Sequence, residues 1–75
     1  KFIYAFDNEP RNREIVARIE TTIERGDKVV IFPRDVHEKD INDMVLAGRD
    51  VKRMIESNVY QGLEAKLKLN TWKKV

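Results

Sequence analysis

The sequence predicts an α/β fold in which two parallel strands are joined by one helix and followed by two or three short helices. Two runs of β-branched and aromatic residues, at positions 2–6 and 29–32, are typical of buried strands. Between them, apolar residues recur at helical spacing with charged residues on the other side. Two strands connected by a single helix form a βαβ unit, and the strands of such a unit are parallel.

The first strand is expected over residues 2–6 as a buried run. The helix is expected to begin at Pro10, because a proline in the first turn loses no needed hydrogen bond, and to end at Gly26. The second strand is expected over 29–32, where Pro33 ends it. The buried stripe of the helix is expected to comprise Ile15, Val16, Ile19 and Ile23.

After the second strand, residues 34–39 are expected to form a polar loop. Asp40 is expected to cap a short helix that Gly48 ends, and Asp50 to cap another. A final amphipathic helix is expected over 60–69. The buried stripes of these helices are expected to be Ile41, Met44 and Val45, then Val51, Met54 and Ile55, and last Tyr60, Leu63 and Leu67.

Length and composition predict one small folded domain. The chain has 75 residues, of which 41% are hydrophobic and 37% charged, with three glycines and two prolines, unlike a disordered linker. It has no cysteine, which excludes a disulfide framework and a cysteine zinc site, and no stretch typical of a membrane span or signal peptide. We therefore expect a cytoplasmic protein.

The chain begins at Lys1 directly before a strand, so we expect 1–75 to be a single partial domain, with a βαβ core over 1–48 and a basic helical segment over 49–75.

The charge is distributed unevenly along the chain. Residues 1–48 hold eight Lys/Arg and ten Asp/Glu, giving −2, whereas residues 49–75 hold seven Lys/Arg and three Asp/Glu, giving +4. An acidic half followed by a basic half suits a metal site beside a surface that faces a polyanion. A solvated helical surface with incidental lysines explains the same counts. Charge does not decide between these two interpretations.

The first candidate site is the segment Asp7-Asn8-Glu9, directly after the first strand. In open α/β sheets, ligands collect at the carboxyl ends of parallel strands. Two carboxylates two residues apart can point their oxygens the same way, and Mg²⁺ binds through oxygen, using one or two protein carboxylates. Acidic residues are also common just before a first helical turn, so stabilisation of the following helix explains this segment equally well.

The second candidate site is the polar segment 35–43, which leaves the end of the neighbouring strand, so the fold could bring it beside the first. Asp40 and Asp43 are three residues apart at a helix start and could instead cap that helix reciprocally. His37 has neither a second histidine nor a cysteine with which to share zinc. The chain contains no GxSxG pattern and no Walker-type loop, which argues against a serine hydrolase and a P-loop enzyme.

The order of these motifs resembles the Toprim fold, which bacterial-type primases, topoisomerases and several nucleases share. Phe6-Asp7-Asn8-Glu9 resembles the Asp-x-Asp motif of that family. Segment 39–48, which reads Lys-Asp-Ile-Asn-Asp-Met-Val-Leu-Ala-Gly, resembles the primase and helicase-primase version of the following loop. Segment 62–67 and Trp72-Lys73-Lys74 resemble, less specifically, the end of primases from large tailed phages. The resemblance covers nearly the whole chain and implies a truncated Toprim-like (Rossmann-like) domain.

The resemblance also implies a function. The parent protein would be a DNA primase, a nucleotidyltransferase that makes RNA primers from nucleotides on a single-stranded DNA template, with a replicative helicase as a further partner. Asp7 and Glu9 would be its catalytic residues. The ligands of one or two Mg²⁺ (or Mn²⁺) ions would be Asp7, Glu9, Asp40 and Asp43. The residues facing nucleic acid or a partner would be Lys66, Lys68, Lys73 and Lys74.

Two departures from the family limit these expectations. Glu9 stands where most members have aspartate, and its longer arm shifts the position of a bound ion. The family's first motif, a glutamate on an earlier strand, has no counterpart in this chain, so activity of the chain alone is not expected. Two alternatives stay open: a fragment of a Toprim nuclease or maturase, and a non-catalytic module that binds nucleic acid or a helicase.

Overall fold

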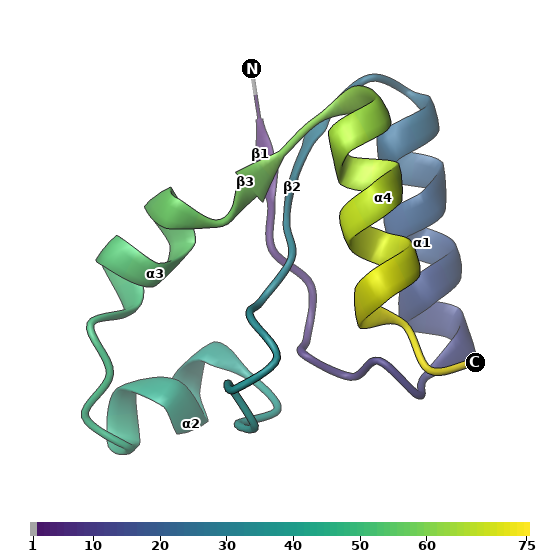
Figure 1. The fold of residues 1–75 in the computed structure, drawn as a ribbon. Helices are drawn as coiled ribbons and strands as arrows, with labels where there is room; N and C mark the ends of the chain where they lie inside the picture. Colours follow the sequence, from purple (N-terminus) through teal and green to yellow (C-terminus); the bar gives the residue numbers. More distant parts are fainter. Residues whose placement is uncertain (1) are drawn as a thin grey trace.

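The structure, a computed structural model, describes residues 2–75, and the expectation attached to Lys1 lies outside the described residues. Its helices and strands bear out the predicted α/β class, with three short helices after the second strand (Figure 1). In chain order they are β1 (Ile3–Tyr4), α1 (Arg13–Glu24), β2 (Lys28–Val30), α2 (Ile41–Leu46), α3 (Val51–Ser57), β3 (Val59–Tyr60) and α4 (Gly62–Trp72).

The sheet contains the predicted parallel pair and one strand that was not predicted. Tyr4 of β1 lies opposite Val29 of β2 in parallel register, which confirms the βαβ unit. On the other side of β2, Val59 of β3 lies opposite Val30 in antiparallel register, so the order is β1-β2-β3. Tyr60 was predicted to lie in the final helix, and this prediction was wrong, because two residues are too few to show the alternation that marks a strand.

The first strand is shorter and more exposed than expected. Only Ile3 and Tyr4 pair with β2, and the exposed fractions of Phe2 and Ile3 are 71% and 52%. The prediction of a buried strand over 2–6 was therefore wrong at its start. Within the described sheet, β1 is an edge strand with a neighbour on one side, and an edge position leaves part of its side chains in solvent.

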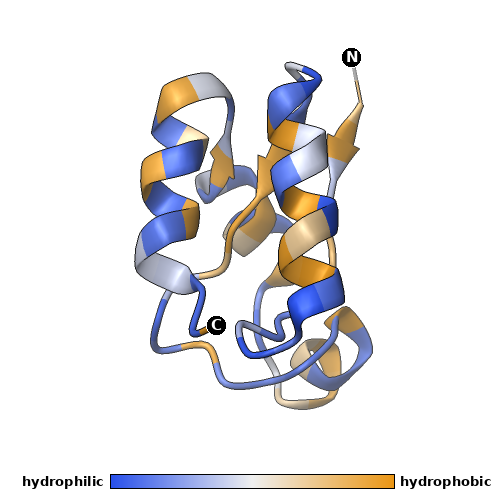
Figure 2. Ribbon diagram, turned by 90° about the vertical axis from the view of Figure 1, so that its right-hand side faces the viewer, coloured by the Kyte–Doolittle hydropathy of each residue, from blue (hydrophilic) through white to orange (hydrophobic). Residues whose placement is uncertain are grey.

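Strand β2 spans Lys28–Val30 rather than the predicted 29–32, but the whole apolar run 29–32 is buried, with side chains on both faces of the sheet. Val29 and Ile31 belong to a cluster with α1 and α4, whereas Val30 and Phe32 belong to a second cluster with Met44 of α2. Helices α1 and α4 therefore lie side by side on one face of the sheet, and α2 and α3 on the other (Figure 1). Figure 2 shows hydrophobic strands behind helices whose turns alternate between hydrophilic and hydrophobic.

Helix α1 starts later than predicted. Its cap is Asn12, whose Oδ1 accepts hydrogen bonds from the backbone N–H groups of Glu14 at 3.0 Å and Ile15 at 3.1 Å. Pro10 lies in the turn before the helix, so the prediction that the helix begins there was wrong. An asparagine side chain satisfies two of the free N–H groups of the first turn, which a proline ring cannot do. The predicted end holds, with Gly26 at φ +86° directly after the last turn.

Helix α4 buries a different stripe from the one predicted. Leu63 and Leu67 are 72% and 59% exposed, whereas Ala65, Leu69 and Trp72 are buried against α1 and β2. The helix leaves the short strand β3, and that pairing sets which side of α4 faces the core. Both sides carry apolar residues, so their periodicity did not distinguish them.

Helix α2 also buries less than predicted. Met44 is fully buried, but Ile41 and Val45 are 38% and 56% exposed, because this six-residue helix contacts the core through one side chain. The predicted stripe of α3 does pack on the same cluster, through the partly buried residues Val51, Met54 and Ile55. No helix within residues 2–75 has both the length and the apolar content to cross a membrane.

Candidate functional site

The two acidic segments predicted from the sequence lie side by side. The backbone N–H of Asn8, between the two acids of the first segment, donates to the carbonyl of Lys39 at 2.6 Å. The Asn8 side-chain Nδ2 donates to the carbonyls of Val36 at 2.8 Å and Glu38 at 3.0 Å. The segment after β1 and the loop after β2 are thus joined at one edge of the sheet, as the parallel topology led us to expect.

Asn8 is the residue that joins these segments, and sequence reasoning missed its role. It is buried, with 8% of its surface exposed, and its Oδ1 accepts a hydrogen bond from Nε1 of Trp72 at 3.0 Å. The backbone N–H of Lys74 donates to the carbonyl of Pro10 at 2.8 Å, two residues further along the same turn. Two hydrogen bonds therefore attach the end of α4 to residues 7–10, which we call the acidic turn. The only local signal was a polar amide between two acids, which is equally common on exposed turns.

Lys39 lies among the carboxylates of this edge. Its Nζ is 3.3 Å from Oε2 of Glu9. The hydrogen bond to Glu9, followed by the negative charges of Glu9, Asp7 and Asp40, raises the pKa of Lys39 above its usual 10.5. The Lys39 side chain is 62% exposed, so solvent screens this pair. Any cation that binds Glu9 must share it with an ammonium group that is already present.

Asp40 caps helix α2, which is one of the two roles predicted for it. Its Oδ1 accepts a hydrogen bond from the backbone N–H of Asp43 at 2.9 Å. Asp50 caps α3 in the same way, with its Oδ1 3.2 Å from the backbone N of Arg53. A carboxylate has two oxygens and about four acceptor positions, so the cap leaves Asp40 with an oxygen that can bind an ion. Capping and ion binding are therefore compatible at Asp40.

Within residues 2–75, no group of three or more His, Cys, Asp or Glu side chains is arranged to hold a metal ion. This geometry does not fit an ion held by protein ligands alone. Mg²⁺, however, commonly binds one or two carboxylates and completes its shell with water and substrate phosphate oxygens. Asp7 is exposed and Glu9 and Asp40 are half-buried, so an ion of that kind can reach any one or two of these carboxylates.

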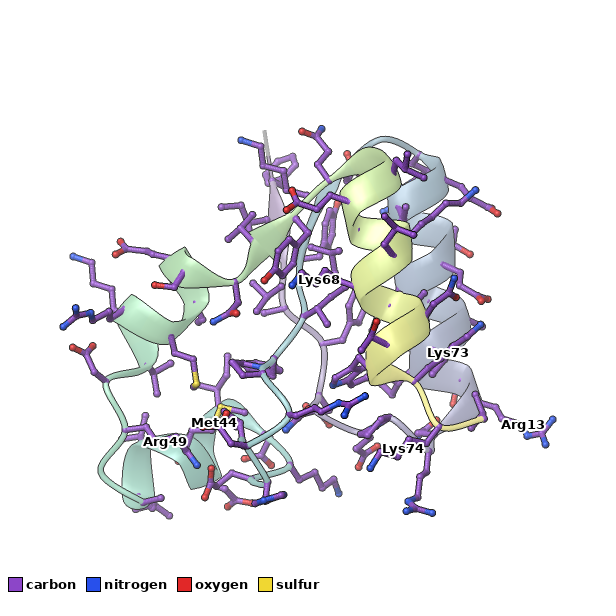
Figure 3. All side chains as sticks on the ribbon, in the orientation of Figure 1. Arg13, Met44, Arg49, Lys68, Lys73 and Lys74 are labelled. Carbon is purple, nitrogen blue, oxygen red and sulfur yellow. The ribbon has the colours of Figure 1, made fainter. Side chains whose placement is uncertain are left out.

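Glu38 belongs to a structural ion pair in the same loop. Nε of Arg49, which is labelled in Figure 3, donates to Oε1 of Glu38. Nη2 of Arg49 lies 3.5 Å from the carbonyl of Asp35. The hydrogen bond from Arg49 lowers the pKa of Glu38 below its usual 4.5. Arg49 thus attaches the loop after β2 to the connection between α2 and α3, and the carboxylate of Glu38 faces this guanidinium.

The four candidate lysines lie in different environments, and Figure 3 labels three of them, Lys68, Lys73 and Lys74. Nζ of Lys68 lies 5.2 Å from the centre of the Tyr60 ring, on the side of α4 that faces β3. Nζ of Lys73 lies 3.5 Å from Oε2 of Glu20, and Lys66 lines a hollow that also includes Glu20. Lys74 is exposed after the end of α4. Lys66 and Lys73 therefore lie near acidic residues of α1, whereas Lys68 lies over the Tyr60 ring.

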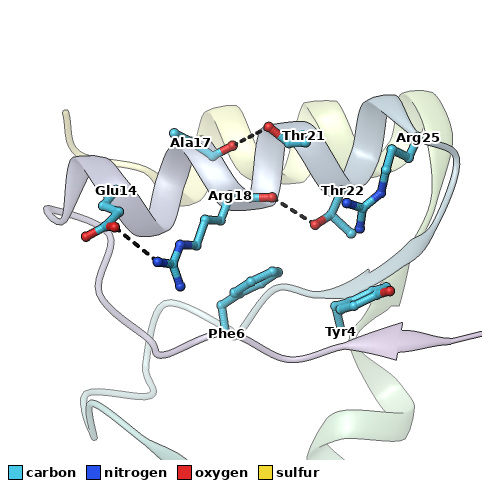
Figure 4. A pocket seen from close by; sticks show the side chains of 8 residues that line it. All are labelled: Tyr4, Phe6, Glu14, Ala17, Arg18, Thr21, Thr22 and Arg25. Atoms are coloured by element: carbon cyan, nitrogen blue, oxygen red, sulfur yellow. Dashed lines mark hydrogen bonds and ion pairs between the residues drawn. The ribbon is translucent and has the colours of Figure 1, made fainter.

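A hollow of about 420 Å³ lies elsewhere, between α1 and the N-terminal strand (Figure 4). The rings of Tyr4 and Phe6 are stacked on one side of it, with centroids 6.3 Å apart. On the other side, Arg18 and Glu14 form an ion pair at 3.0 Å. None of the four predicted metal-binding acids lines it, so cavity size does not locate the candidate site.

Comparison with known proteins gives one informative similarity. No family model matches the sequence. The chain is 27% identical over 78 residues to a DNA primase of Enterobacteria phage T4. The match covers 97% of this chain and 23% of the phage protein, so the chain spans about a quarter of the length of that relative. The chain is therefore similar, over nearly all of its length, to a region of a DNA primase.

Proposed function

We propose that the chain is the metal-binding part of a Toprim-type DNA primase, in which Asp7, Glu9 and Asp40 supply the protein ligands of one or two Mg²⁺ ions during RNA primer synthesis on single-stranded DNA. The observation that carries the proposal is the 2.6 Å hydrogen bond from Asn8 to Lys39, which brings the two acidic segments to one edge of the sheet. The similarity to a phage DNA primase supports it and favours primer synthesis over strand cleavage.

Each acid has a distinct part in this proposal. Asp7 is exposed, three residues after the end of β1, and is free to approach a substrate. Glu9 is held by Asn12, whose Nδ2 donates to its Oε1 at 2.8 Å, and by Lys39. Asp40 contributes the oxygen that its cap does not use, and Asp43 contributes through water. When bound, Mg²⁺ would neutralise phosphate charge and orient the attacking 3′-hydroxyl.

Positioning and charge are most of what phosphoryl-type transfer requires of a protein. A few carboxylates on a rigid edge, without a nucleophilic side chain, are therefore sufficient for this part of the reaction. Lys39 adds a positive charge where the phosphates would lie. Because Lys39 also pairs with Glu9, we expect the isolated chain to bind divalent ions weakly and a nucleotide substrate to strengthen that binding.

The test in the full-length protein is Asp7→Asn, which keeps the size of the side chain and removes its charge. Primer synthesis from ribonucleotides on a single-stranded template is expected to be lost, while circular dichroism and thermal unfolding stay unchanged. Asp27→Asn is the matched control, since Asp27 lies before β2, at the opposite end of that strand from the acidic segments, and pairs with Arg25 at 3.1 Å. Undiminished primer synthesis by the Asp7→Asn protein would remove Asp7 from the mechanism.

The test in the chain itself is a Mn²⁺ titration followed by NMR. Paramagnetic broadening is expected first at the amides of Asp7, Glu9 and Asp40, and Asp7→Asn should reduce it. Broadening that is spread evenly over acidic residues, including Asp27 and Asp50, would contradict a site at this edge.

A further inference from the structure

Another hollow lies between the end of β2, strand β3 and helix α4. Its volume is about 240 Å³. We call it the β3–α4 groove, and the lining residues that matter here are Phe32, Arg34, Asn58, Tyr60, Lys68 and Trp72.

The charge of this groove distinguishes it from the other hollows of the described residues. It contains two cationic side chains, Arg34 and Lys68, and no carboxylate. Four other hollows in residues 2–75 each include at least one carboxylate, among them Glu14, Glu24 and Asp50. Arg34 is exposed and has no hydrogen bond or ion pair to another described residue. The groove therefore presents unneutralised positive charge, which favours an anionic ligand.

The aromatic side chains indicate which class of anion the groove binds. Tyr60 is half-buried, and the ammonium of Lys68 lies over its ring at 5.2 Å. Cationic side chains beside an aromatic ring are typical of surfaces that bind single-stranded nucleic acid, in which the cations contact phosphate and a base stacks on the ring. When Lys68 moves to a phosphate, the face of Tyr60 becomes available to a base.

The volume of the groove favours one unit of a nucleic-acid strand over a small molecule as its ligand. Sites that enclose small molecules usually have volumes of roughly 300–1,000 Å³. A volume of about 240 Å³ suits one unit of a chain that passes over the surface. The groove also adjoins the acidic edge, because Trp72 lines it and donates its indole N–H to Asn8.

We propose that the β3–α4 groove binds one nucleotide unit of a single-stranded nucleic acid, with Arg34 and Lys68 on the phosphate and Tyr60 against the base. This inference rests on the proposed function, because a primase would supply the single strand that occupies the groove. The buried hydrogen bond from Trp72 to Asn8 connects the wall of this groove to the segment that carries Asp7. The groove needs no divalent ion, so the two proposals can fail separately.

The test is fluorescence anisotropy of a labelled oligothymidylate with the 75-residue chain, at low salt and with EDTA present. Arg34→Ala and Lys68→Ala are each expected to weaken binding several-fold. Each should also reduce the slope of log affinity against log salt by about 0.7, the value for one phosphate contact on a single strand. Tyr60→Leu should weaken binding while changing the salt slope little, since it removes stacking and leaves the charges. Circular dichroism checks that each variant is folded.

The control variants lie outside the groove. Lys52→Ala, at an exposed position on α3, is expected to leave the affinity unchanged. Lys66→Ala, on α4 itself but beside Glu20 and Glu24, should have a smaller effect than Lys68→Ala. Equal losses at Lys66 and Lys68, or no binding to the unmodified chain, would overturn the proposal.

Two further measurements complete the test. An oligouridylate in place of the oligothymidylate distinguishes an RNA strand from a DNA strand, and binding of either supports the groove. A free nucleoside triphosphate that displaces the strand at lower concentration than an unlabelled oligonucleotide would instead indicate a small-molecule site and overturn the proposal. Asp27→Asn, whose carboxylate pairs with Arg25 outside the groove, should bind the strand normally.

Discussion

The indole N–H of Trp72 donates to Oδ1 of Asn8 at 3.0 Å, across 64 positions of the sequence. The same asparagine donates through Nδ2 to two carbonyls of the loop after β2 and through its backbone to Lys39. A buried amide with all of these partners joins three segments that are distant in sequence: the acidic turn, the loop and the end of α4. The geometry of the candidate metal site therefore depends on a residue that does not itself bind metal.

Trp72→Phe tests this connection. The change keeps an aromatic ring in the core but leaves Oδ1 of the buried Asn8 without its donor, which is expected to lower the free energy of unfolding by about 1–3 kcal/mol. Urea denaturation followed by circular dichroism measures it, because Trp72 is the only tryptophan and fluorescence is lost with it. Thr71→Ala, at an exposed neighbour, should cost less than about 0.5 kcal/mol. Equal stability of the Trp72→Phe and unmodified chains would contradict the assigned role.

Two substitutions at Asp40 distinguish its role as a helix cap from a role in metal binding. Asp40→Ala removes the cap of α2 and is expected to cost about 0.5–2 kcal/mol of stability. Asp40→Asn keeps a good cap without the charge, so it should retain stability while reducing the broadening caused by Mn²⁺. Asp50→Asn, the same change at the cap of α3, should leave that broadening unchanged. A normal Mn²⁺ response in Asp40→Asn would show that Asp40 serves as a cap alone.

The ion pair between Glu38 and Arg49 predicts a pH dependence. The hydrogen bond from Arg49 lowers the pKa of Glu38 in the folded chain, so the folded state favours the ionised carboxylate. Its contribution to stability is present above the usual pKa of 4.5 and is lost as the pH falls through the lower folded value. NMR titration of the Glu38 side chain should give a midpoint below 4.5, and Arg49→Met should move that midpoint upward. A midpoint at or above the usual value would contradict the pair.

The corrected orientation of α4 predicts a large difference between two leucines in that helix. Leu69 is 3% exposed and Leu67 is 59% exposed. Leu69→Ala should lower the free energy of unfolding by about 2–5 kcal/mol, because it removes methyl groups from the core and leaves a cavity. Leu67→Ala should change it by less than about 0.5 kcal/mol. Thermal and urea unfolding of the two variants compare them directly, and a greater loss at Leu67 would support the stripe first expected from the sequence.

The sequence by itself determined the features that depend on near neighbours. The βαβ unit follows from two apolar runs and one helical stripe, and the caps at Asp40 and Asp50 follow from acidic residues placed just before helical patterns. The end of α1 at Gly26 follows from the backbone freedom of glycine. Even the adjacency of the two acidic segments could be expected, because parallel neighbouring strands end at the same edge of a sheet.

Only the tertiary structure decided the features that depend on distant partners. Strand β3 exists because Val59 can pair with Val30, and the buried side of α4 follows from where β3 places its first turn. The burial of Asn8 required Trp72, and the charge of the β3–α4 groove required Arg34 and Lys68 to meet from separate segments. Periodicity and capping report on the residues within a few positions of one another, and they carry no information about which distant side chain will complete a hydrogen bond or line a groove.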